Sequence, residues 1–191
     1  MKYHTIGDWR LSRIGLGCYG LSGVYGPVDE AGFERTLRAA VEQGVNFFDT
    51  AEGYGIAETF LGRVLAPVRD QVYIATKVSG KGGQPDLSAG AVRAACQASL
   101  KRLGTDVIDL YQIHFDDPHT SVLETVTALD GLVEAGMIRR YGVSHLPVDR
   151  VLDYAEAGGI FSVLMELSPV ARDALETLLP ICKEYNLAAI A

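Results

Sequence analysis

Short apolar runs alternate with amphipathic segments along almost the whole chain, and this alternation is the strongest constraint on its fold. The runs are partly β-branched or aromatic and are bounded by Gly, Pro or Asp, which is typical of buried parallel strands. Helix-sized segments between them predict an α/β fold with a parallel sheet, either doubly wound or closed into a barrel. The expected strands are residues 12–17, 45–50, 72–76, 107–115, 140–144, 161–167 and 187–191.

Four intervening segments have helical periodicity together with residues that favour helix ends. Ser88 and Ser121 are suited to N-terminal caps, since Ser121 is followed three residues later by a glutamate. Before the first strand, residues 3–15 predict a small hairpin with its turn at Gly7 and Asp8. The expected helices are residues 29–44, 87–104, 120–136 and 173–186, the last with a potential kink at Pro180.

Composition limits the classes of function. The 191 residues suffice for one domain, which we expect to span residues 1–191, and the net charge of −7 comes without a basic run. Nucleic acid and anionic membranes are therefore not expected partners, and no apolar stretch reaches membrane-spanning length. The N-terminus lacks the apolar region of a signal peptide. Three cysteines far apart, without C-x-x-C spacing, predict no zinc site and a reducing, cytoplasmic location.

Residues 14–23 contain the pattern G-x-G-x-x-G at Gly15, Gly17 and Gly20. In a Rossmann unit the last glycine opens a helix, so that a pyrophosphate meets the helix N-terminus. Here Gly23, Gly26 and Pro27 follow before any helical periodicity begins. The pattern therefore favours a flexible loop after the first strand over a Rossmann fingerprint.

Polar residues follow the apolar strands at the points where the strands end. In a parallel barrel all the strand C-termini face one mouth, which carries the active site. We therefore expect these side chains to converge. They are Asp49 with Tyr54 just beyond it, then Lys77, then His114, then Ser144 with His145.

Each of these residues also has an ordinary structural explanation. Asp49 could cap the following turn, Tyr54 could pack in a loop, and His114 could be a buried imidazole with satisfied hydrogen bonds. Lys77 is harder to explain in this way, because charged residues at the ends of buried strands are usually paired or functional. All these explanations would have to hold together on consecutive strands, which favours a functional site.

The four residues make a coherent set for reducing a carbonyl. Tyr54 would serve as the proton donor, and a nearby Lys77 ammonium would lower the pKa of its hydroxyl from about 10 in water. Asp49 would pair with the lysine, and His114 would hydrogen-bond the carbonyl oxygen. The result is a donor directed at a developing alkoxide.

The motifs FDTAEGYG, IATKVS, DLYQIHFDDP and GMIRRYGVSH closely resemble, in order and spacing, those of the aldo-keto reductase family. The resemblance implies a (β/α)8 TIM barrel with an N-terminal β-hairpin, and NADP(H) as cofactor for carbonyl reduction or alcohol oxidation. By position it implies Tyr54 as general acid, tuned by Lys77 and Asp49, with His114 orienting the substrate.

The resemblance also implies which residues lie near the cofactor: Gly17, Cys18, Asp49, Ser144 and His145. Two positions depart from the family pattern. His145 stands where the family usually has Asn. In the second departure, a leucine, Leu164, stands where a Gln usually binds the nicotinamide carboxamide, a bond that leucine cannot make.

The third departure is length, because a complete barrel takes about 250 residues. This chain predicts about seven strands and hence an incomplete barrel whose first and seventh strands are unpaired edges. Two other functions stay open. Lys77 could form a Schiff base in an aldolase, or the chain could be a non-catalytic nicotinamide-binding or regulatory protein. The substrate, the choice between NADPH and NADH, and the oligomeric state are not determined by the sequence.

Overall fold

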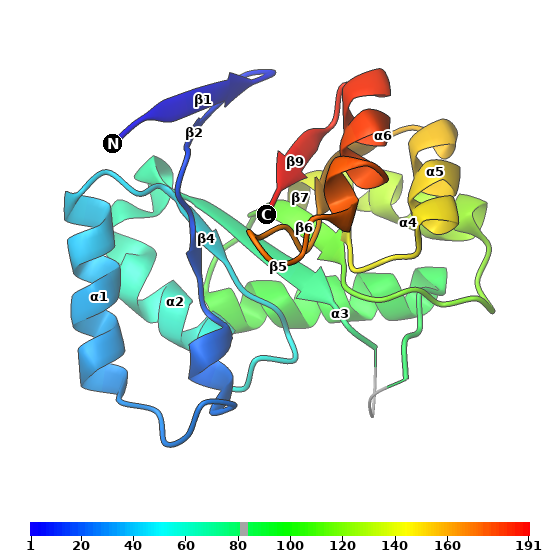
Figure 1. Ribbon diagram of the computed structural model, residues 1–191. Helices are drawn as coiled ribbons and strands as arrows, with labels where there is room; N and C mark the ends of the chain where they lie inside the picture. Colours follow the sequence, from blue (N-terminus) through cyan, green and yellow to red (C-terminus); the bar gives the residue numbers. More distant parts are fainter. Residues whose placement is uncertain (81–83) are drawn as a thin grey trace.

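A computed structural model describes residues 1–80 and 84–191 and shows an α/β fold built on a curled, seven-stranded parallel sheet (Figure 1). Neighbours in the sheet are also neighbours in the chain, in the order β3-β4-β5-β6-β7-β8-β9. This is the strand order of a (β/α)8 barrel that lacks closure, as expected. The strands are β3 (Leu16–Gly17), β4 (Phe47–Asp49), β5 (Tyr73–Val78), β6 (Ile108–Ile113), β7 (Ile138–Ser144), β8 (Ile160–Leu164) and β9 (Ala188–Ile190).

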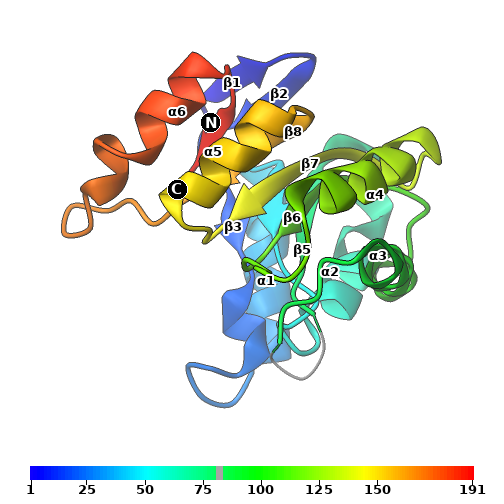
Figure 2. The same cartoon turned by 90° about the vertical axis from the view of Figure 1, so that its right-hand side faces the viewer.

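Helices cover the outer face of the sheet (Figure 2). The largest hydrophobic cluster lies between the helices and that face, and includes Leu37, Leu61, Cys96, Leu129 and Tyr154, all fully buried. The α-helices are α1 (Glu30–Glu42), α2 (Ala57–Leu65), α3 (Ala89–Leu103), α4 (Val122–Glu134), α5 (Val148–Ala157) and α6 (Leu178–Glu184). Short 3₁₀ helices are η1 (Tyr19–Ser22), η2 (Ala66–Gln71) and η3 (Asp173–Leu175).

A separate antiparallel hairpin, β1 (Tyr3–Ile6) and β2 (Trp9–Ser12), lies at one end of the sheet, with Gly7 at a positive φ in its turn (Figure 1). Trp9 is buried, and its ring lies 4.9 Å from that of Tyr73 and 4.8 Å from that of Phe161, centroid to centroid. Those two residues are at or near the starts of their strands. The hairpin therefore closes the end of the sheet opposite the strand C-termini.

Several local expectations differ from the structure. Expected strand 12–17 is divided between β2 and β3, and two helices, α2 and α5, have no counterpart among the four expected ones. The segment after Gly17 contains one short 3₁₀ helix, η1, and otherwise has no regular structure until α1 begins at Glu30, so no α-helix starts where a Rossmann motif would need one. Expected helix 173–186 is split into η3 and α6, and Pro180 lies in the first turn of α6, where proline is tolerated.

The two serine caps also behave differently from one another. Ser121 caps α4 as expected, since its hydroxyl accepts the backbone N–H of Glu124 at 3.2 Å. Ser88 occupies the capping position of α3, but its hydroxyl donates to the Asp86 carboxylate at 2.6 Å instead. The hydroxyl is thus oriented toward Asp86, and its oxygen accepts no backbone N–H in the first turn of α3.

The sheet ends at β3 and β9, and within residues 1–80 and 84–191 each of these strands has a ladder partner on one side only. A cavity of about 410 Å³ is lined by residues of both edge strands, β3 and β9, and by part of the hairpin. Its apolar lining includes the partly buried Leu16, Leu164 and Ile190. Unpaired strands beside apolar side chains are templates for intermolecular pairing.

We therefore expect the 191-residue chain to self-associate in solution. Size-exclusion chromatography with light scattering measures this, and association should increase with protein concentration. A compact monomer that stays monomeric across the concentration range would contradict the expectation.

Gly62 permits close packing of α2 against the end of α3. A Cβ at Gly62 would overlap the backbone carbonyl of Leu103, whereas a Cβ at Gly90, in α3, would meet nothing within 4 Å. We expect Gly62→Ala to lower the free energy of unfolding by about 1–3 kcal/mol through overpacking. Gly90→Ala should be neutral or should stabilise by up to about 1 kcal/mol. Urea denaturation of both variants checks this, and equal effects would contradict it.

Candidate active site

The expected functional residues are gathered at the C-terminal ends of neighbouring strands. Asp49 ends β4, Lys77 is the penultimate residue of β5, His114 directly follows β6, and Ser144 ends β7. The register of the parallel strands fixes how far along the sheet each residue lies, since Asp49 pairs with Ala75 and Lys77 pairs with Gln112. All four residues therefore share one rim of the sheet, opposite the hairpin.

Lys77 and Asp49 form an ion pair in which the lysine is buried and the aspartate side chain is 19% exposed. The Lys77 ammonium donates to Asp49 Oδ2 at 2.5 Å and to the carbonyl of Thr50 at 2.8 Å, and the lysine side chain is 1% exposed. The Gln112 side-chain amide donates to the other carboxylate oxygen at 3.2 Å. Burial raises the pKa of Asp49, and Lys77 and Gln112 oppose this by stabilising the carboxylate.

Gln112 was not among the expected site residues. A signal for it exists in the sequence, because a polar residue interrupts the apolar strand two positions before His114 and so points to the same face of the sheet. Its register places it beside Lys77 and within reach of Asp49. It belongs to the same cluster of polar side chains.

Tyr54 lies in the loop between β4 and α2, and its hydroxyl approaches His114 Nε2 at 3.4 Å. Burial, the Asp49 carboxylate, and the neighbouring Tyr19 and Cys18 raise the pKa of Tyr54 to about 12. This is opposite to the expected lowering by Lys77. The reason is geometric, because the Lys77 ammonium is 5.2 Å from the tyrosine ring centroid and is already paired with Asp49. The hydroxyl is therefore protonated at neutral pH.

His114 is 5% exposed and has a hydroxyl near each ring nitrogen. Nδ1 is 2.7 Å from Ser79 Oγ, Nε2 faces Tyr54, and the ring stacks on Phe115 with centroids 4.1 Å apart. Burial lowers the pKa of His114 to about 3, and the charges of Lys77 and His145 act in the same direction. The imidazole is therefore neutral near pH 7 and offers one N–H donor.

This pKa has a consequence for stability. Because His114 has a lower pKa in the folded chain than the ordinary 6.5, the unfolded chain binds the extra proton first as the pH falls. Protonation of His114 should therefore leave the free energy of unfolding unchanged above about pH 6.5. Between about pH 6.5 and pH 3 the free energy of unfolding should fall as the pH falls, by up to about 1.4 kcal/mol per pH unit. Urea unfolding of wild type and His114→Gln at several pH values measures this. Parallel pH dependences in the two proteins would contradict it.

The residues expected to contact a cofactor differ in how they are presented. Gly17 is exposed, and a Cβ there would meet nothing within 4 Å. Cys18 is fully buried, its backbone included, and burial raises the pKa of its thiol to about 12. Ser144 is also fully buried, and its hydroxyl has no hydrogen-bond partner among the described residues.

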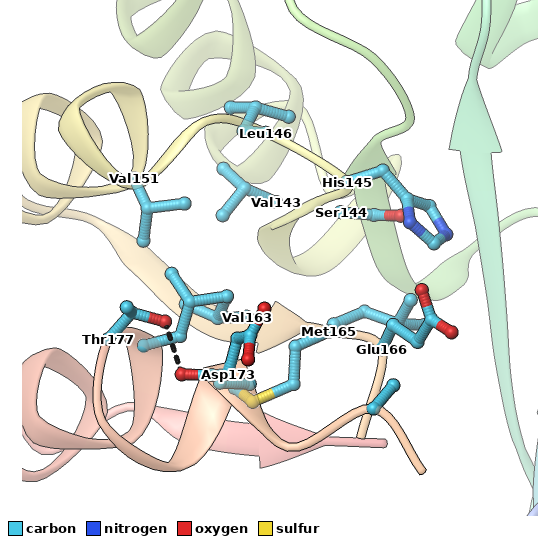
Figure 3. Close-up of a pocket in the computed structure, with 14 residues that line it drawn as sticks. Val143, Ser144, His145, Leu146, Val151, Val163, Met165, Glu166, Asp173 and Thr177 are labelled. Carbon is cyan, nitrogen blue, oxygen red and sulfur yellow. Dashed lines mark hydrogen bonds between the residues drawn. The ribbon is translucent and has the colours of Figure 1, made fainter. Parts of the chain in front are cut away.

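Ser144 and His145 border a cavity of about 330 Å³ at the ends of β7 and β8 (Figure 3). Met165 and Glu166 lie across from them in this view, and the lining also includes the apolar Val143, Val151 and Val163. His145 is exposed and adopts a left-handed backbone with φ of 51°, which turns the chain sharply at the strand end. An unpartnered hydroxyl beside a cavity fits a carboxamide ligand, while Leu164 in the same lining offers it no hydrogen bond.

Within residues 1–80 and 84–191, no group of three or more His, Cys, Asp or Glu side chains is arranged to hold a metal ion. In the same part of the chain, no helix is both long enough and apolar enough to cross a membrane. The polar cluster at the rim can donate protons and hydrogen bonds to an oxygen atom placed near Tyr54 and His114.

Known proteins resemble this chain in sequence over nearly its whole length. Residues 13–191 match the Aldo/keto reductase family. The chain is 34% identical to the aldo-keto reductase YhdN of Bacillus subtilis, over 100% of this chain and 61% of the relative. It is also 34% identical to probable aldo-keto reductase 1 of Glycine max, over 95% of this chain and 55% of the relative.

Two solved structures are similar to this chain over nearly its whole length. A holo-form aldo-keto reductase of Bacillus halodurans superposes with a TM-score of 0.90 and 33% identity, over 99% of this chain and 65% of that one. The glycerol dehydrogenase of Gluconobacter oxydans superposes with a TM-score of 0.87 and 28% identity, over 98% and 62%. The chain thus spans less than two thirds of the length of these relatives.

Proposed function

The chain belongs to the aldo/keto reductase family, and from this premise we propose that it is an oxidoreductase that transfers hydride between NADP(H) and an aldehyde or ketone. The observation that carries the proposal is the cluster at the rim, in which Tyr54 and His114 face each other at 3.4 Å beside the Lys77–Asp49 pair. Two neutral donors beside this ion pair are suited to stabilising an oxygen that gains negative charge.

Each residue of the cluster has a separate role in the proposal. Tyr54 donates its proton to the carbonyl oxygen, and the Nε2 side of His114 orients that oxygen. Asp49 holds Lys77 in place through the 2.5 Å contact, and the ammonium supplies positive charge beside the tyrosine once its proton has left. Before proton transfer Asp49 balances this charge, and the pKa of Tyr54 is not lowered. A reduced nicotinamide would supply the hydride.

We propose that Gly17, Cys18, Asp49, Ser144 and His145 form the nicotinamide site, with the fully buried Cys18 as support beneath it. Gly17 leaves room for a ring beside the backbone, and the unpartnered Ser144 hydroxyl is suited to the carboxamide. His145 replaces the usual Asn, and its ring can donate or accept a hydrogen bond at the same edge. Leu164 offers no hydrogen bond, so cofactor orientation rests on fewer polar contacts.

The wider proposal includes small carbonyl or alcohol substrates as partners, a single domain over residues 1–191 and a cytoplasmic location. The cysteines support a reducing compartment, since Cys18, Cys96 and Cys182 are all buried and unpaired with one another. Size-exclusion chromatography with light scattering determines the oligomeric state.

A regulatory nicotinamide-binding protein is the second candidate, favoured by Leu164, which offers the carboxamide no hydrogen bond. A Schiff-base aldolase is disfavoured, because the Lys77 ammonium is held by Asp49 and Thr50 and would have to lose a proton to attack a carbonyl.

The test is hydride transfer itself. Purified protein is incubated with NADPH deuterated at the transferable position and with a panel of simple aldehydes, and the alcohol product is examined by mass spectrometry. Deuterium in the alcohol, with loss of cofactor absorbance, supports the reductase. Saturable cofactor binding without deuterium transfer would favour the regulatory candidate, and substrate trapped on Lys77 by borohydride would favour the aldolase.

A further inference from the structure

We propose that Ser79 is a positioning residue that selects the tautomer of His114, so that Nδ1 accepts a hydrogen bond and Nε2 carries the proton. Ser79 directly follows β5, and its hydroxyl lies 2.7 Å from His114 Nδ1. The inference deepens the proposed carbonyl reduction, on which its catalytic part rests. The tautomer assignment itself depends only on contacts within this chain.

The backbone of Ser79 is held firmly from two sides. Its N–H donates to Glu52 Oε1 at 2.5 Å, and the N–H of Gly80 donates to the same oxygen at 3.2 Å. The other Glu52 oxygen lies 3.8 Å from the Arg102 guanidinium on α3. Glu52 lies two residues before Tyr54, so one carboxylate ties the tyrosine loop to the serine that contacts His114.

The backbone of His114 is attached to the same strand end. Its N–H donates to the carbonyl of Val78 at 3.0 Å, one residue before Ser79. The backbones of Ser79 and His114 are therefore both held at the C-terminal end of β5, and the histidine ring also stacks on Phe115.

The direction of the hydrogen bond follows from its chemistry. A distance of 2.7 Å is typical of a hydroxyl donor and lies at the short end of the range of about 2.7–3.2 Å for an N–H donor to oxygen, which favours the serine as donor. Ser79 Oγ also has no other hydrogen-bond acceptor among the described residues. With the serine proton on this bond, Nδ1 is the acceptor and the single proton of the neutral ring is on Nε2.

The tautomer determines what Tyr54 can do. With a bare Nε2, His114 would accept the Tyr54 proton and direct it away from a substrate. With a protonated Nε2, the histidine donates toward the tyrosine oxygen and the mouth, and the Tyr54 proton is free for the carbonyl oxygen. Ser79 thereby sets the direction of proton donation without touching the substrate.

The test combines NMR with kinetics on the 191-residue chain. Protein labelled with ¹⁵N-histidine is studied near neutral pH as wild type, Ser79→Ala and Ser79→Thr, where threonine keeps the hydroxyl. In wild type we expect the His114 signals of a protonated Nε2 and an unprotonated Nδ1. Ser79→Ala should populate the other tautomer, and Ser79→Thr should restore the wild-type pattern.

The same three proteins are assayed for carbonyl reduction. Ser79→Ala should lower kcat about tenfold, as for the loss of one hydrogen bond worth roughly 1.4 kcal/mol, with KM nearly unchanged and with recovery in Ser79→Thr. A proton on Nδ1 in wild type, or a His114 tautomer unchanged in Ser79→Ala, would overturn the assignment. Absence of turnover in all three proteins would instead overturn the proposed function, because the NMR result stands independently of activity.

Discussion

Tyr54→Phe is expected to lower the rate of carbonyl reduction by about 10²–10⁴-fold while leaving cofactor binding unchanged. The substitution removes only a hydroxyl. Within the described residues that hydroxyl makes one contact, at 3.4 Å to His114, so the fold loses little. Because the pKa of Tyr54 is raised to about 12, its hydroxyl stays protonated from neutral to moderately alkaline pH.

The pH dependence of the reduction rate provides a second test of the role of Tyr54. A proton donor whose pKa is raised to about 12 does not ionise between neutral and moderately alkaline pH, so Tyr54 itself should cause no loss of reduction there. Steady-state rates in wild type and Tyr54→Phe over this range, with fluorescence titration of the cofactor, make the measurement.

Tyr111→Phe is the matched control for this experiment. Tyr111 is fully buried on β6, and its hydroxyl has no hydrogen-bond partner among the described residues. Its removal should leave turnover unchanged and stability equal or slightly higher, since an unsatisfied buried polar group is lost. Equal turnover in wild type and Tyr54→Phe would refute the role proposed for Tyr54.

Lys77→Met is expected to lower the free energy of unfolding by about 3–5 kcal/mol. Methionine has a similar length but leaves the Asp49 carboxylate, in a largely buried setting, without its 2.5 Å partner. The carbonyl of Thr50 loses a donor as well. Since a typical domain is stable by only about 5–15 kcal/mol, this single change consumes a large share of the total.

The effect should depend on pH in a defined direction. Asp49 already has a raised pKa through burial, and the loss of Lys77 removes the main influence that lowers it. The folded variant then binds a proton more tightly than the unfolded chain does, so its deficit in stability should shrink as the pH falls. Urea denaturation at neutral and mildly acidic pH measures this change.

Two controls separate the ion pair from general effects of substitution. The double variant Lys77→Met with Asp49→Asn should recover part of the loss, with a coupling of about 1–3 kcal/mol. Arg38→Met removes an exposed partner of Glu34, with the arginine side chain 55% exposed, and should cost less than about 1 kcal/mol. Similar losses of the free energy of unfolding in Lys77→Met and Arg38→Met would show that burial of Lys77 does not increase the cost of breaking its ion pair.

Much of the architecture could be predicted from local pattern. The apolar runs and their glycine boundaries placed all seven strands of the sheet, because burial on both faces requires continuous apolar stretches. Expected strand 12–17 was wrong in its bounds, because β2 pairs in the hairpin and only Leu16 and Gly17 join the sheet. Helix α2 follows the Tyr54 loop directly, and at 9 residues its amphipathic pattern is too short to separate the helix from the loop.

The positions of Asp49, Lys77 and His114 at strand ends follow from the sequence by itself, because parallel strands place their C-termini on one rim. Only the tertiary structure decided how these groups act on one another. The contact of Ser79 with His114, the amide of Gln112 on Asp49, the complete burial of Cys18 and the raised pKa of Tyr54 all depend on distances between side chains far apart in the chain. Hydrogen bonding and desolvation change over a few tenths of an ångström, and sequence periodicity carries no information at that scale.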